Sequence, residues 1–412
     1  MSRMKVLVSA YACEPKTGSE PGVGWHWVRE MARFHEIWVI TRENNRTSIE
    51  LELVANPMSN VHWIYFDLPR WARFWKKGRR GVHLYYYLWQ LGAYLLARRL
   101  HRKVAFELAH HVTLVTYWMP SFLALLPIPF VWGPVGGGES GPFQFLKTMS
   151  LRGRMYEHLR DAVRWLAQLD PLLRRTVRRA RVAIATTEET ADRIRRLGCT
   201  NVLVYSQVGL SPEELEVLGT APVRAGEGPV RFLSIGSLLD LKGFHLALEA
   251  FARVRQRFVD SEYWILGDGP ERKRLERLAQ TLCVSGSVTF FGWQDRAIVF
   301  KRLGECDVVL HPSLHDSGGW ACVEALAAGR PVVCLDLGGP SVLVGDEVGI
   351  RVPATTPASV VSTFSESMQS LAGNPQIRKR LGEEARRWVR HNFDWHSKGE
   401  WMNTQYEEAV RR

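Results

Sequence analysis

The 412-residue sequence predicts an α/β protein built from two Rossmann-like domains that face each other across a cleft. Three observations support this fold class. Short apolar runs alternate with amphipathic stretches of helix length, which is typical of a parallel sheet covered by helices. The alternation occurs as two series, separated by a polar stretch at residues 211–229. The chain also exceeds the roughly 250–300 residues at which a single hydrophobic core stops growing.

The first series of apolar runs lies in the N-terminal half. Its short runs have the length of buried strands, and its two longer runs have the length of helices. Strands are expected at Lys5–Ser9, Ile37–Thr41, Val61–Phe66, Leu108–Val112 and Phe130–Val135, and helices at Trp25–Phe34 and Leu84–His101. Residues 112–138 are uncharged over a length that could cross a membrane, but four prolines interrupt them, so we expect a short helix and then a buried strand.

The second series, in the C-terminal half, has clearer boundaries. Glycine, proline or polar residues separate its runs, and strand-like and helix-like runs alternate along most of its length. Strands are expected at Val230–Ile235, Tyr263–Leu266, Val288–Phe291, Asp307–His311, Pro331–Leu335 and Gly349–Val352, and helices at Phe244–Phe258, Glu271–Leu282 and Gly319–Ala328. Two doubly wound units joined by residues 211–229 follow from the two series.

The net charge of +12 is concentrated in the N-terminal half. Residues 1–205 contain 30 lysines and arginines against 16 aspartates and glutamates, so the remaining residues are close to neutral. This asymmetry indicates an anionic partner for the first half, whether phospholipid, nucleic acid or a phosphorylated acceptor. The six cysteines show no C-x-x-C spacing, and we interpret them as reduced thiols of a cytoplasmic protein. The apolar run near the N-terminus is interpreted as a first strand, because it is too short and interrupted for an export signal.

An aromatic segment at residues 81–97 has basic residues at both ends. Ten lysines and arginines lie between Arg70 and Lys103, and no acid occurs between Asp67 and Glu107. This pattern fits a helix that lies on an anionic membrane, with its aromatic side chains among the headgroups and its basic ends on phosphates. A helix buried in the core with solvated ends fits equally well. Nucleic-acid binding is disfavoured, because the basic residues flank apolar aromatics and form no recognition motif.

Residues able to bind a phosphorylated ligand follow four strands of the C-terminal half. In an open parallel sheet, ligands bind beyond the carboxyl ends of the strands. Lys242 opens a helix after the first strand, where its charge and the helix N–H groups can meet a diphosphate. Glycines after the strands let a ligand approach the backbone closely. The four segments are Gly236-Ser237 to Lys242-Gly243, Gly267-Asp268-Gly269, Phe291-Gly292, and His311 to Glu324 with Asp316, Gly318 and Gly319.

These motifs resemble the family-4 retaining glycosyltransferases, which have the GT-B architecture, and the resemblance extends over nearly the whole chain. The donor motif of that family is a carboxylate followed eight positions later by a glutamate, and the pair here is Asp316 and Glu324. The resemblance implies a nucleoside-diphosphate sugar, UDP- or GDP-linked, with Lys242 at the diphosphate, Glu324 on the ribose and Asp316 on a sugar hydroxyl. Further donor-site residues are expected to be Gly236, Ser237, Gly267, Asp268, Gly292, Gly318 and Gly319.

The resemblance also implies the reaction and the domain boundaries. We expect transfer of a hexose, with retention, to a lipid-linked or polysaccharide acceptor in cell-envelope or exopolysaccharide assembly. The expected location is the cytoplasm, peripheral on the inner face of an anionic membrane. The absence of an Asp-x-Asp pair and of His/Cys ligand spacing agrees with catalysis without a metal, and no cofactor is expected. The expected parts are an acceptor domain at 1–210, a linker at 211–229, a donor domain at 230–391, and a helix at 392–412 that crosses back to the first domain.

The N-terminal half is expected to complete the site. Gly22 and Gly24 lie in a glycine-rich segment before the helix at Trp25, and this segment resembles the family loop beside the donor phosphates. His110 and His111 follow the fourth strand, where the family has a histidine facing the transferred sugar. We favour His111 for this role, with His110 as a structural or acceptor-side residue. Gly136 and Glu139, in a second glycine-rich loop, are expected on the acceptor side.

Two departures from the family pattern keep an alternative open. Ser237 stands where many members have arginine, so half of the diphosphate clamp is missing or comes from another residue. Asp316 stands where glutamate is commoner, and its side chain is one methylene shorter. The alternative is a glycosyltransferase-like protein that binds a nucleotide but is catalytically silent and serves as the partner of an active enzyme.

Overall fold

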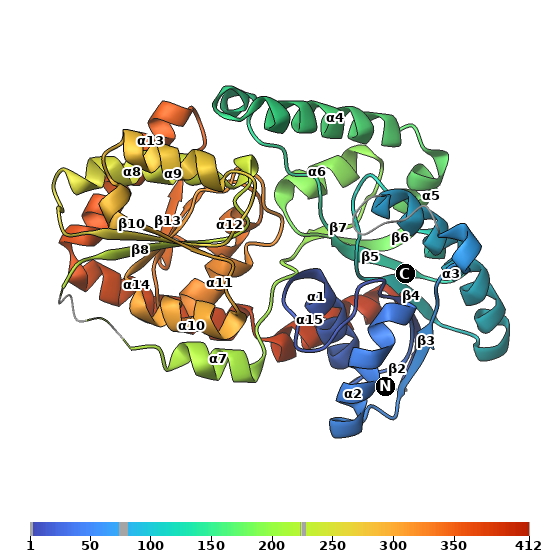
Figure 1. Cartoon of the computed structure of the whole chain (residues 1–412). Coiled ribbons are helices and arrows are strands. Elements are labelled where there is room, and N and C mark those ends of the chain that lie inside the picture. The colour runs from blue at the N-terminus through green and yellow to red at the C-terminus, as the bar shows by residue number, and fades with distance from the viewer. Residues whose placement is uncertain (1–2, 74–80, 223, 225–227, 412) are drawn as a thin grey trace. The chain divides into compact units, whose positions relative to one another are not determined.

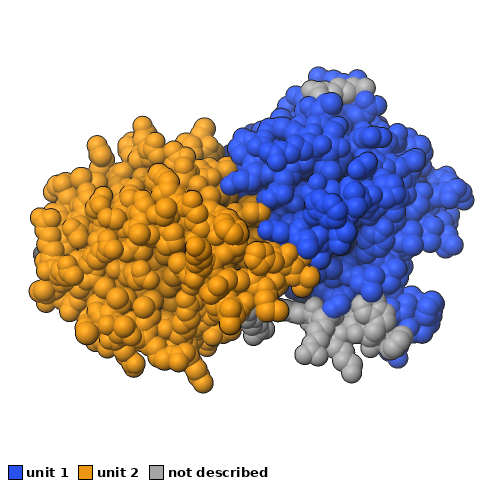
Figure 2. All heavy atoms as spheres, turned by 90° about the horizontal axis from the view of Figure 1, so that it is seen from above, with its two compact units in different colours: residues 1–138, 161–207, 395–412 blue, residues 139–160, 208–394 orange. Residues whose placement is uncertain are grey.

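The computed structural model describes residues 3–73, 81–222, 224 and 228–411, and it divides into two compact units. The first unit contains residues 1–138, 161–207 and 395–412, and the second contains residues 139–160 and 208–394 (Figure 2). Residues 139–160 therefore belong to the second unit, although they were expected in the first. The division falls inside a single helix, α4 (Leu151–Ala167).

The first unit is built on a seven-stranded parallel sheet with the order β3-β2-β1-β4-β5-β6-β7 (Figure 1). Its strands are β1 (Lys5–Ser9), β2 (Glu36–Thr41), β3 (Val61–Tyr65), β4 (Leu108–His111), β5 (Phe130–Val135), β6 (Ala180–Ala185) and β7 (Val202–Val204). Its helices are α1 (Ser19–Met31), α2 (Arg46–Ala55), α3 (Val82–Val104), α5 (Pro171–Arg179), α6 (Glu188–Arg196) and α15 (Trp395–Arg411), with short 3-10 turns η1 (Glu43–Asn45), η2 (Arg70–Ala72) and η3 (Phe122–Leu125). The uncharged stretch at residues 112–138 forms η3 and β5, as expected for a short helical turn followed by a buried strand.

The second unit has a six-stranded parallel sheet with the order β10-β9-β8-β11-β12-β13. Its strands are β8 (Arg231–Ile235), β9 (Glu262–Leu266), β10 (Val288–Gly292), β11 (Val308–His311), β12 (Val332–Leu335) and β13 (Gly349–Val352). Its helices are α7 (Pro212–Gly219), α8 (Phe244–Arg255), α9 (Arg272–Thr281), α10 (Arg296–Glu305), α11 (Trp320–Ala327), α12 (Gly338–Leu343), α13 (Pro357–Gly373) and α14 (Pro375–Asn392), with η4 (Phe143–Thr148), η5 (Asp240–Lys242) and η6 (Ser285–Ser287). Two parallel-sheet α/β units confirm the predicted fold class.

The stretch at residues 211–229 contains a helix as well as connecting chain. Ser211 caps α7 through a reciprocal pair of hydrogen bonds with Glu214, and Pro212 occupies the first helical turn. Such a capping box is a strong helix start, which explains why α7 begins within this polar stretch. Leu218 of α7 is buried in the core of the second unit.

Both sheets reverse their strand order beside the first strand of the unit. In the first unit β1 pairs with β2 on one side and β4 on the other, and in the second β8 pairs with β9 and β11. Loops leaving the carboxyl ends at such a switch point run to opposite faces of the sheet and leave a crevice between them. The polar residues predicted to bind a ligand follow these strands.

The aromatic side chains of α3 belong to the core of the first unit. Tyr85, Tyr86 and Trp89 are all buried, and Trp89 Nε1 donates a hydrogen bond to the Phe66 carbonyl oxygen at 2.8 Å. The expectation that these aromatics meet lipid headgroups is therefore wrong, because the helix packs its aromatic face against the sheet. Lys76, Lys77, Arg79 and Arg80, which were part of that expectation, lie outside the described residues. Among the helices that the structure describes, none has the length and hydropathy needed to cross a bilayer.

The last helix, α15, packs into the first unit beside α1. Its Tyr406 is fully buried, and the Tyr406 hydroxyl lies 2.5 Å from Nδ1 of His110 in β4. Its Lys398 is also buried, donates to the Ser206 carbonyl oxygen at 2.7 Å and lies 4.1 Å from the ring centroid of Tyr205. Burial lowers the pKa of Lys398 to about 7.

We predict that Trp89→Ala destabilises the protein by about 3–5 kcal/mol, as expected when a large buried aromatic leaves a cavity. Leu88→Ala is the matched control, because Leu88 is the neighbouring residue on the same helix but is exposed to 36%, and its replacement should change stability by less than about 0.5 kcal/mol. Urea unfolding followed by circular dichroism measures both. Equal effects of the two substitutions would contradict the burial of the aromatic face.

Candidate functional site

The switch point of the second sheet brings Lys242 and Asp316 into contact. Lys242 follows β8 and Asp316 follows β11, and Lys242 Nζ donates to Asp316 Oδ2 at 2.6 Å. His311, the last residue of β11, places its Nε2 3.1 Å from the same oxygen. Two loops that are 74 residues apart are thus joined by one ion pair at the crevice where α/β sheets bind ligands.

The second oxygen of Asp316 binds backbone N–H groups. Asp316 Oδ1 accepts hydrogen bonds from the amides of Gly318 at 3.1 Å and Gly319 at 3.0 Å, just before α11. A carboxylate has about four acceptor positions, so Lys242, His311 and the two amides account for all of them. Burial alone would raise the pKa of Asp316, but hydrogen bonds and positive charge from His311 and Lys242 hold this pKa well below its usual value. Asp316 is therefore ionised at neutral pH, and all of its acceptor positions are occupied.

Close backbone contacts fix the loop that carries Lys242. Gly243 has a φ of 65°, a left-handed conformation that favours glycine, and a Cβ at this position would lie 2.0 Å from the Pro312 carbonyl oxygen. The amide of Leu314 donates to the Leu241 carbonyl oxygen at 2.8 Å. Both contacts tie the β8 loop to the β11 loop, so the Lys242–Asp316 pair has a rigid base.

The other predicted glycines hold the strand ends together. The amide of Gly236 donates to Leu266 O at 3.0 Å, and the amide of Gly267 donates to Gly292 O at 2.8 Å. Asp268 accepts from the Gly269 amide at 2.7 Å and lies 3.6 Å from an Arg272 nitrogen. The carboxyl ends of β8, β9 and β10 thus form one continuous edge, along which Ser237 is exposed.

Glu324 lies in α11 and is held by a cation that the sequence analysis did not identify. Arg296 Nη2, from the first turn of α10, lies 2.8 Å from Glu324 Oε1 and 2.7 Å from Glu214 Oε1 in α7. The Arg296 guanidinium therefore forms ion pairs with two carboxylates. Burial raises the pKa of Glu324 to about 7, Arg296 opposes this shift, and the charge of Glu214 adds to it. A buried carboxyl group whose pKa lies near neutrality is a candidate for a binding or catalytic role.

The glycines predicted after β1 lie inside helix α1, because that helix begins at Ser19 and not at Trp25. A Cβ at Gly22 would lie 2.0 Å from the Thr17 carbonyl oxygen, and one at Gly24 would lie 2.2 Å from that of Ala12. Both positions therefore need glycine so that α1 can pack on the preceding loop. Glu20, also in the first turn of α1, accepts from the Leu114 amide after β4 at 2.6 Å. These contacts join the β1 and β4 loops at the switch point of the first sheet.

His110 and His111 are both buried at the end of β4, and their ring contacts differ. His110 has a partner at each nitrogen, the Tyr406 hydroxyl at 2.5 Å and the Gly133 carbonyl oxygen at 2.6 Å. His111 places its Nε2 2.6 Å from the Tyr86 hydroxyl. Burial lowers the pKa of His110 to about 4 and, together with the charge of His110, lowers that of His111 to about 3. Both rings are neutral at pH 7, and both ring nitrogens of His110 have a partner.

The remaining predicted residues of the acceptor side fall in different units. Gly136 lies in the first unit, where its amide donates to the Val115 carbonyl oxygen at 2.9 Å. Glu139 is buried in the second unit, and a Cβ at Gly338 would lie 3.3 Å from its Cγ and 2.4 Å from the Asp316 carbonyl oxygen. Glu139 therefore lies beside the loop that carries Asp316, and its assignment to the acceptor domain is not what the structure shows.

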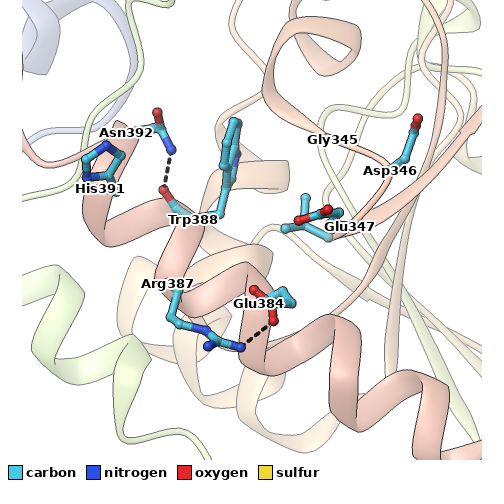
Figure 3. A pocket seen from close by; sticks show the side chains of 9 residues that line it. Gly345, Asp346, Glu347, Glu384, Arg387, Trp388, His391 and Asn392 are labelled. Carbon is cyan, nitrogen blue, oxygen red and sulfur yellow. Dashed lines mark hydrogen bonds and ion pairs between the residues drawn. The ribbon is translucent and has the colours of Figure 1, made fainter.

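A separate hollow of about 340 Å³ lies between α14 and the loop before β13, lined by Trp388, Glu347 and Glu384 among others. Figure 3 shows that Glu384 is paired with Arg387 and that Asn392 binds the Trp388 carbonyl oxygen. The residues that line this hollow include none of the predicted site residues. Within the described part of the chain, no group of three or more His, Cys, Asp or Glu side chains could hold a metal ion.

A family match covers the region that holds Lys242, Asp316 and Glu324. Residues 221–388 match the family described as Glycosyl transferases group 1. The match lies within the second unit. The lipopolysaccharide core biosynthesis glycosyltransferase LpsE of Rhizobium meliloti is 36% identical over 37% of this chain and 42% of its own length. The putative colanic acid biosynthesis glycosyltransferase WcaL of Escherichia coli is 29% identical over 54% of this chain and 56% of its own. The chain thus matches about half the length of these relatives.

Solved structures resemble the whole chain. Sucrose-phosphate synthase from Thermosynechococcus elongatus is 16% identical with a TM-score of 0.65, over 99% of this chain and 100% of that one. HepE from Anabaena, in complex with UDP and glucose, is 17% identical with a TM-score of 0.60, and the match covers 98% of this chain and 100% of that one. These likenesses show the fold, which is GT-B.

The raised pKa of Glu324 predicts how stability depends on pH. The folded carboxyl has a pKa of about 7 against an ordinary value of 4.5, so between these values the folded protein keeps a proton that the unfolded chain releases. This contribution to stability is complete below pH 4.5 and is lost as the pH rises through about 7. Each pKa unit corresponds to about 1.4 kcal/mol. We therefore expect Glu324→Gln to gain roughly 3 kcal/mol relative to the wild type between pH 4.5 and 8. Urea unfolding at both pH values tests this, and parallel pH profiles would contradict it.

Proposed function

We propose that this protein is a retaining glycosyltransferase that moves a hexose from a nucleoside-diphosphate donor. The observation that carries the proposal is the Lys242–Asp316 pair at the switch point of the group 1 domain, with Glu324 on the helix that follows. A departing nucleoside diphosphate gains negative charge. A lysine held at the crevice and the N–H groups of α8 and α11 provide positive potential where that charge develops.

In our proposal the donor is a UDP- or GDP-linked sugar, and separate residues bind its diphosphate and its ribose. Lys242 keeps two N–H donors beyond the one used by Asp316, and these are available to phosphate oxygens. Glu324 accepts the ribose hydroxyls, and Arg296 keeps its carboxylate in one orientation. The UDP complex of HepE supports a uridine donor in a chain of similar fold. No metal or cofactor enters the proposed reaction.

Asp316 takes a different role from the one its family resemblance implies. Its four acceptor positions are filled, so a sugar hydroxyl could bind it only by displacing Lys242 or His311. We assign Asp316 as the residue that positions Lys242 and caps the turn before α11. The shorter side chain of aspartate suits this role, because its carboxylate reaches the Gly318 and Gly319 amides of its own turn.

The first unit is proposed to bind the acceptor, with neutral His111 near the transferred sugar as a hydrogen-bonding group. The acceptor class is a lipid-linked or polysaccharide glycan of the cell envelope. Names of the relatives, which concern lipopolysaccharide core and colanic acid, support this class. We further propose a cytoplasmic location at the inner face of an anionic membrane, where such acceptors are presented, in line with the excess of basic residues in the first 205 positions.

The catalytically silent alternative has one observation in its favour. Ser237 is exposed and uncharged, so the β8 turn supplies a single cation, Lys242, whose nitrogen is already bound by Asp316. Titration with UDP followed by an assay of donor hydrolysis distinguishes an active glycosyltransferase from a catalytically silent nucleotide-binding protein. Binding without turnover of any UDP- or GDP-sugar would support the silent partner.

Lys242→Ala should lower kcat/KM by about 10²–10³, the usual loss when a group that stabilises developing charge is removed. Lys379→Ala is the control, since Lys379 is an exposed lysine of the same unit on α14. Steady-state kinetics with the donor identified by thermal shift measures the effect. A loss below about tenfold would mean that another cation holds the diphosphate.

Glu324→Ala should abolish the thermal shift produced by UDP while the far-ultraviolet circular dichroism stays that of the wild type. The physical reason is that ribose loses its acceptor, while the alanine remains a good helix former in α11. Glu366→Ala, at a glutamate of α13, is the control. Unchanged UDP affinity in a folded Glu324→Ala protein would remove Glu324 from the site.

A further inference from the structure

Helix α4 exposes a row of large apolar side chains and buries two of its charged residues, Glu157 and Arg164, while its Asp161 side chain is exposed to 57%. Glu157 and Arg164 are each exposed to only 3%, and Arg160 pairs with Glu157. The opposite face is apolar and open to solvent, with exposures of 42–74% for its large side chains. These are Leu151, Met155, Tyr156, Leu159, Val163, Trp165 and Leu166, and Leu169 follows just after the helix. At 100° per residue they occupy one side of the helix.

Interactions on its polar side hold α4 in this orientation. At its start, Ser150 donates to Asp240 through its amide at 3.0 Å and its hydroxyl, and Gly153 lies against the same carboxylate. In its last turns, the Arg164 guanidinium lies 5.9 Å from the ring centroid of Tyr117. Both contacts are made on the polar side of the helix, and the apolar side is exposed. An exposed apolar surface of this size on a folded protein marks an interaction site.

The helix that follows α4 in the chain, α5, is strongly basic. Helix α5 begins four residues after α4 ends (Figure 1). Residues 171–181 contain five arginines and no acid. Arg174, Arg175 and Arg178 are all exposed. Within the same unit, α3 and α5 both pack on η3. Helix α3 also has an outward row of leucines, Leu84, Leu88, Leu91 and Leu95, followed by exposed Arg98, Arg99, Arg102 and Lys103.

We propose that α4 and α5 dock this protein on an anionic lipid bilayer, with α4 lying in the plane of the interface. The apolar face of α4 enters the boundary between headgroups and acyl chains, and the arginines of α5 contact lipid phosphates. A broad apolar face next to arginines, with no acid between them on α5, is complementary to such a surface. The inference rests on the proposed lipid-linked acceptor, and it moves the membrane contact from the aromatic residues of α3, which are buried, to α4.

Co-sedimentation with vesicles tests the docking. The full-length protein should bind vesicles of equal parts phosphatidylcholine and phosphatidylglycerol, bind pure phosphatidylcholine much more weakly, and lose affinity as salt rises. Met155→Glu with Leu159→Glu should abolish binding. The control is Leu51→Glu with Val54→Glu, at exposed apolar residues of α2, and should bind as the wild type does. Arg175→Glu with Arg178→Glu should weaken binding at least ~30-fold, since each basic residue contributes about 1 kcal/mol at an anionic surface.

A second measurement does not depend on the glutamate variants folding. A polarity-sensitive fluorophore at Leu166→Cys should shift to the blue on anionic vesicles, whereas the same probe at Val54→Cys should not. Both are made in a Cys283→Ser background, because Cys283 is the exposed cysteine and the others are buried. Equal responses at the two positions would overturn the docking of α4.

Measuring UDP binding in the same variants distinguishes a failure of the docking proposal from a failure of the proposed glycosyltransferase function. UDP should shift the melting temperature equally in the wild type and the α4 variants, which lie outside the donor residues. Vesicle binding without any nucleotide response would count against the glycosyltransferase and not against the docking. No vesicle binding, or self-association in ultracentrifugation that the α4 glutamates abolish, would overturn the docking and identify a protein contact.

Discussion

The arrangement of the loops around the candidate site in the second unit depends on one carboxylate, that of Asp316. Its two oxygens bind Lys242 and His311 on one side and the Gly318 and Gly319 amides on the other. The β8 loop, the end of β11 and the start of α11 are thereby held at one point. A buried carboxylate with four donors is stable as an anion, because each donor replaces a water molecule that burial removes. The position of the lysine, and the turn under the helix that carries Glu324, follow from this arrangement.

The strands of both sheets could largely be predicted from the sequence, because buried parallel strands are short, apolar and bounded by glycine, proline or polar residues. All six strands of the second sheet lie where expected. Strands β6 and β7 went unpredicted, since Ala180–Ala185 is alanine-rich and interrupted by Arg181, and Val202–Val204 has three residues. The start of α1 was placed too late, because glycine and proline at residues 21–24 indicate a loop, whereas tight packing against Ala12 and Thr17 places those glycines in a helix.

The residues of the candidate site were foreseeable by their place after strands, but their pairings were not. Lys242 and Asp316 were expected to face different parts of a ligand, and they contact each other. Arg296 and Glu214 had no signal in the sequence, because an arginine and a glutamate on amphipathic helices are usually solvated. Only the fold brings α7, α10 and α11 together around the Glu324 carboxylate. The same holds for Tyr86 and Tyr406, whose hydroxyls meet His111 and His110 from distant helices.

The return of α15 to the first unit makes that unit discontinuous along the chain, since it combines residues near both ends. The Tyr406 hydroxyl that contacts His110 and the Lys398 that donates to the Ser206 carbonyl oxygen are both synthesised after the whole of the second unit. During translation the second unit can therefore complete its sheet while the first still lacks a helix of its core. A nascent chain that stops before Trp395 lacks the Tyr406 hydroxyl that contacts His110 Nδ1 in β4, so the core of the first unit can close only after the whole second unit has been synthesised.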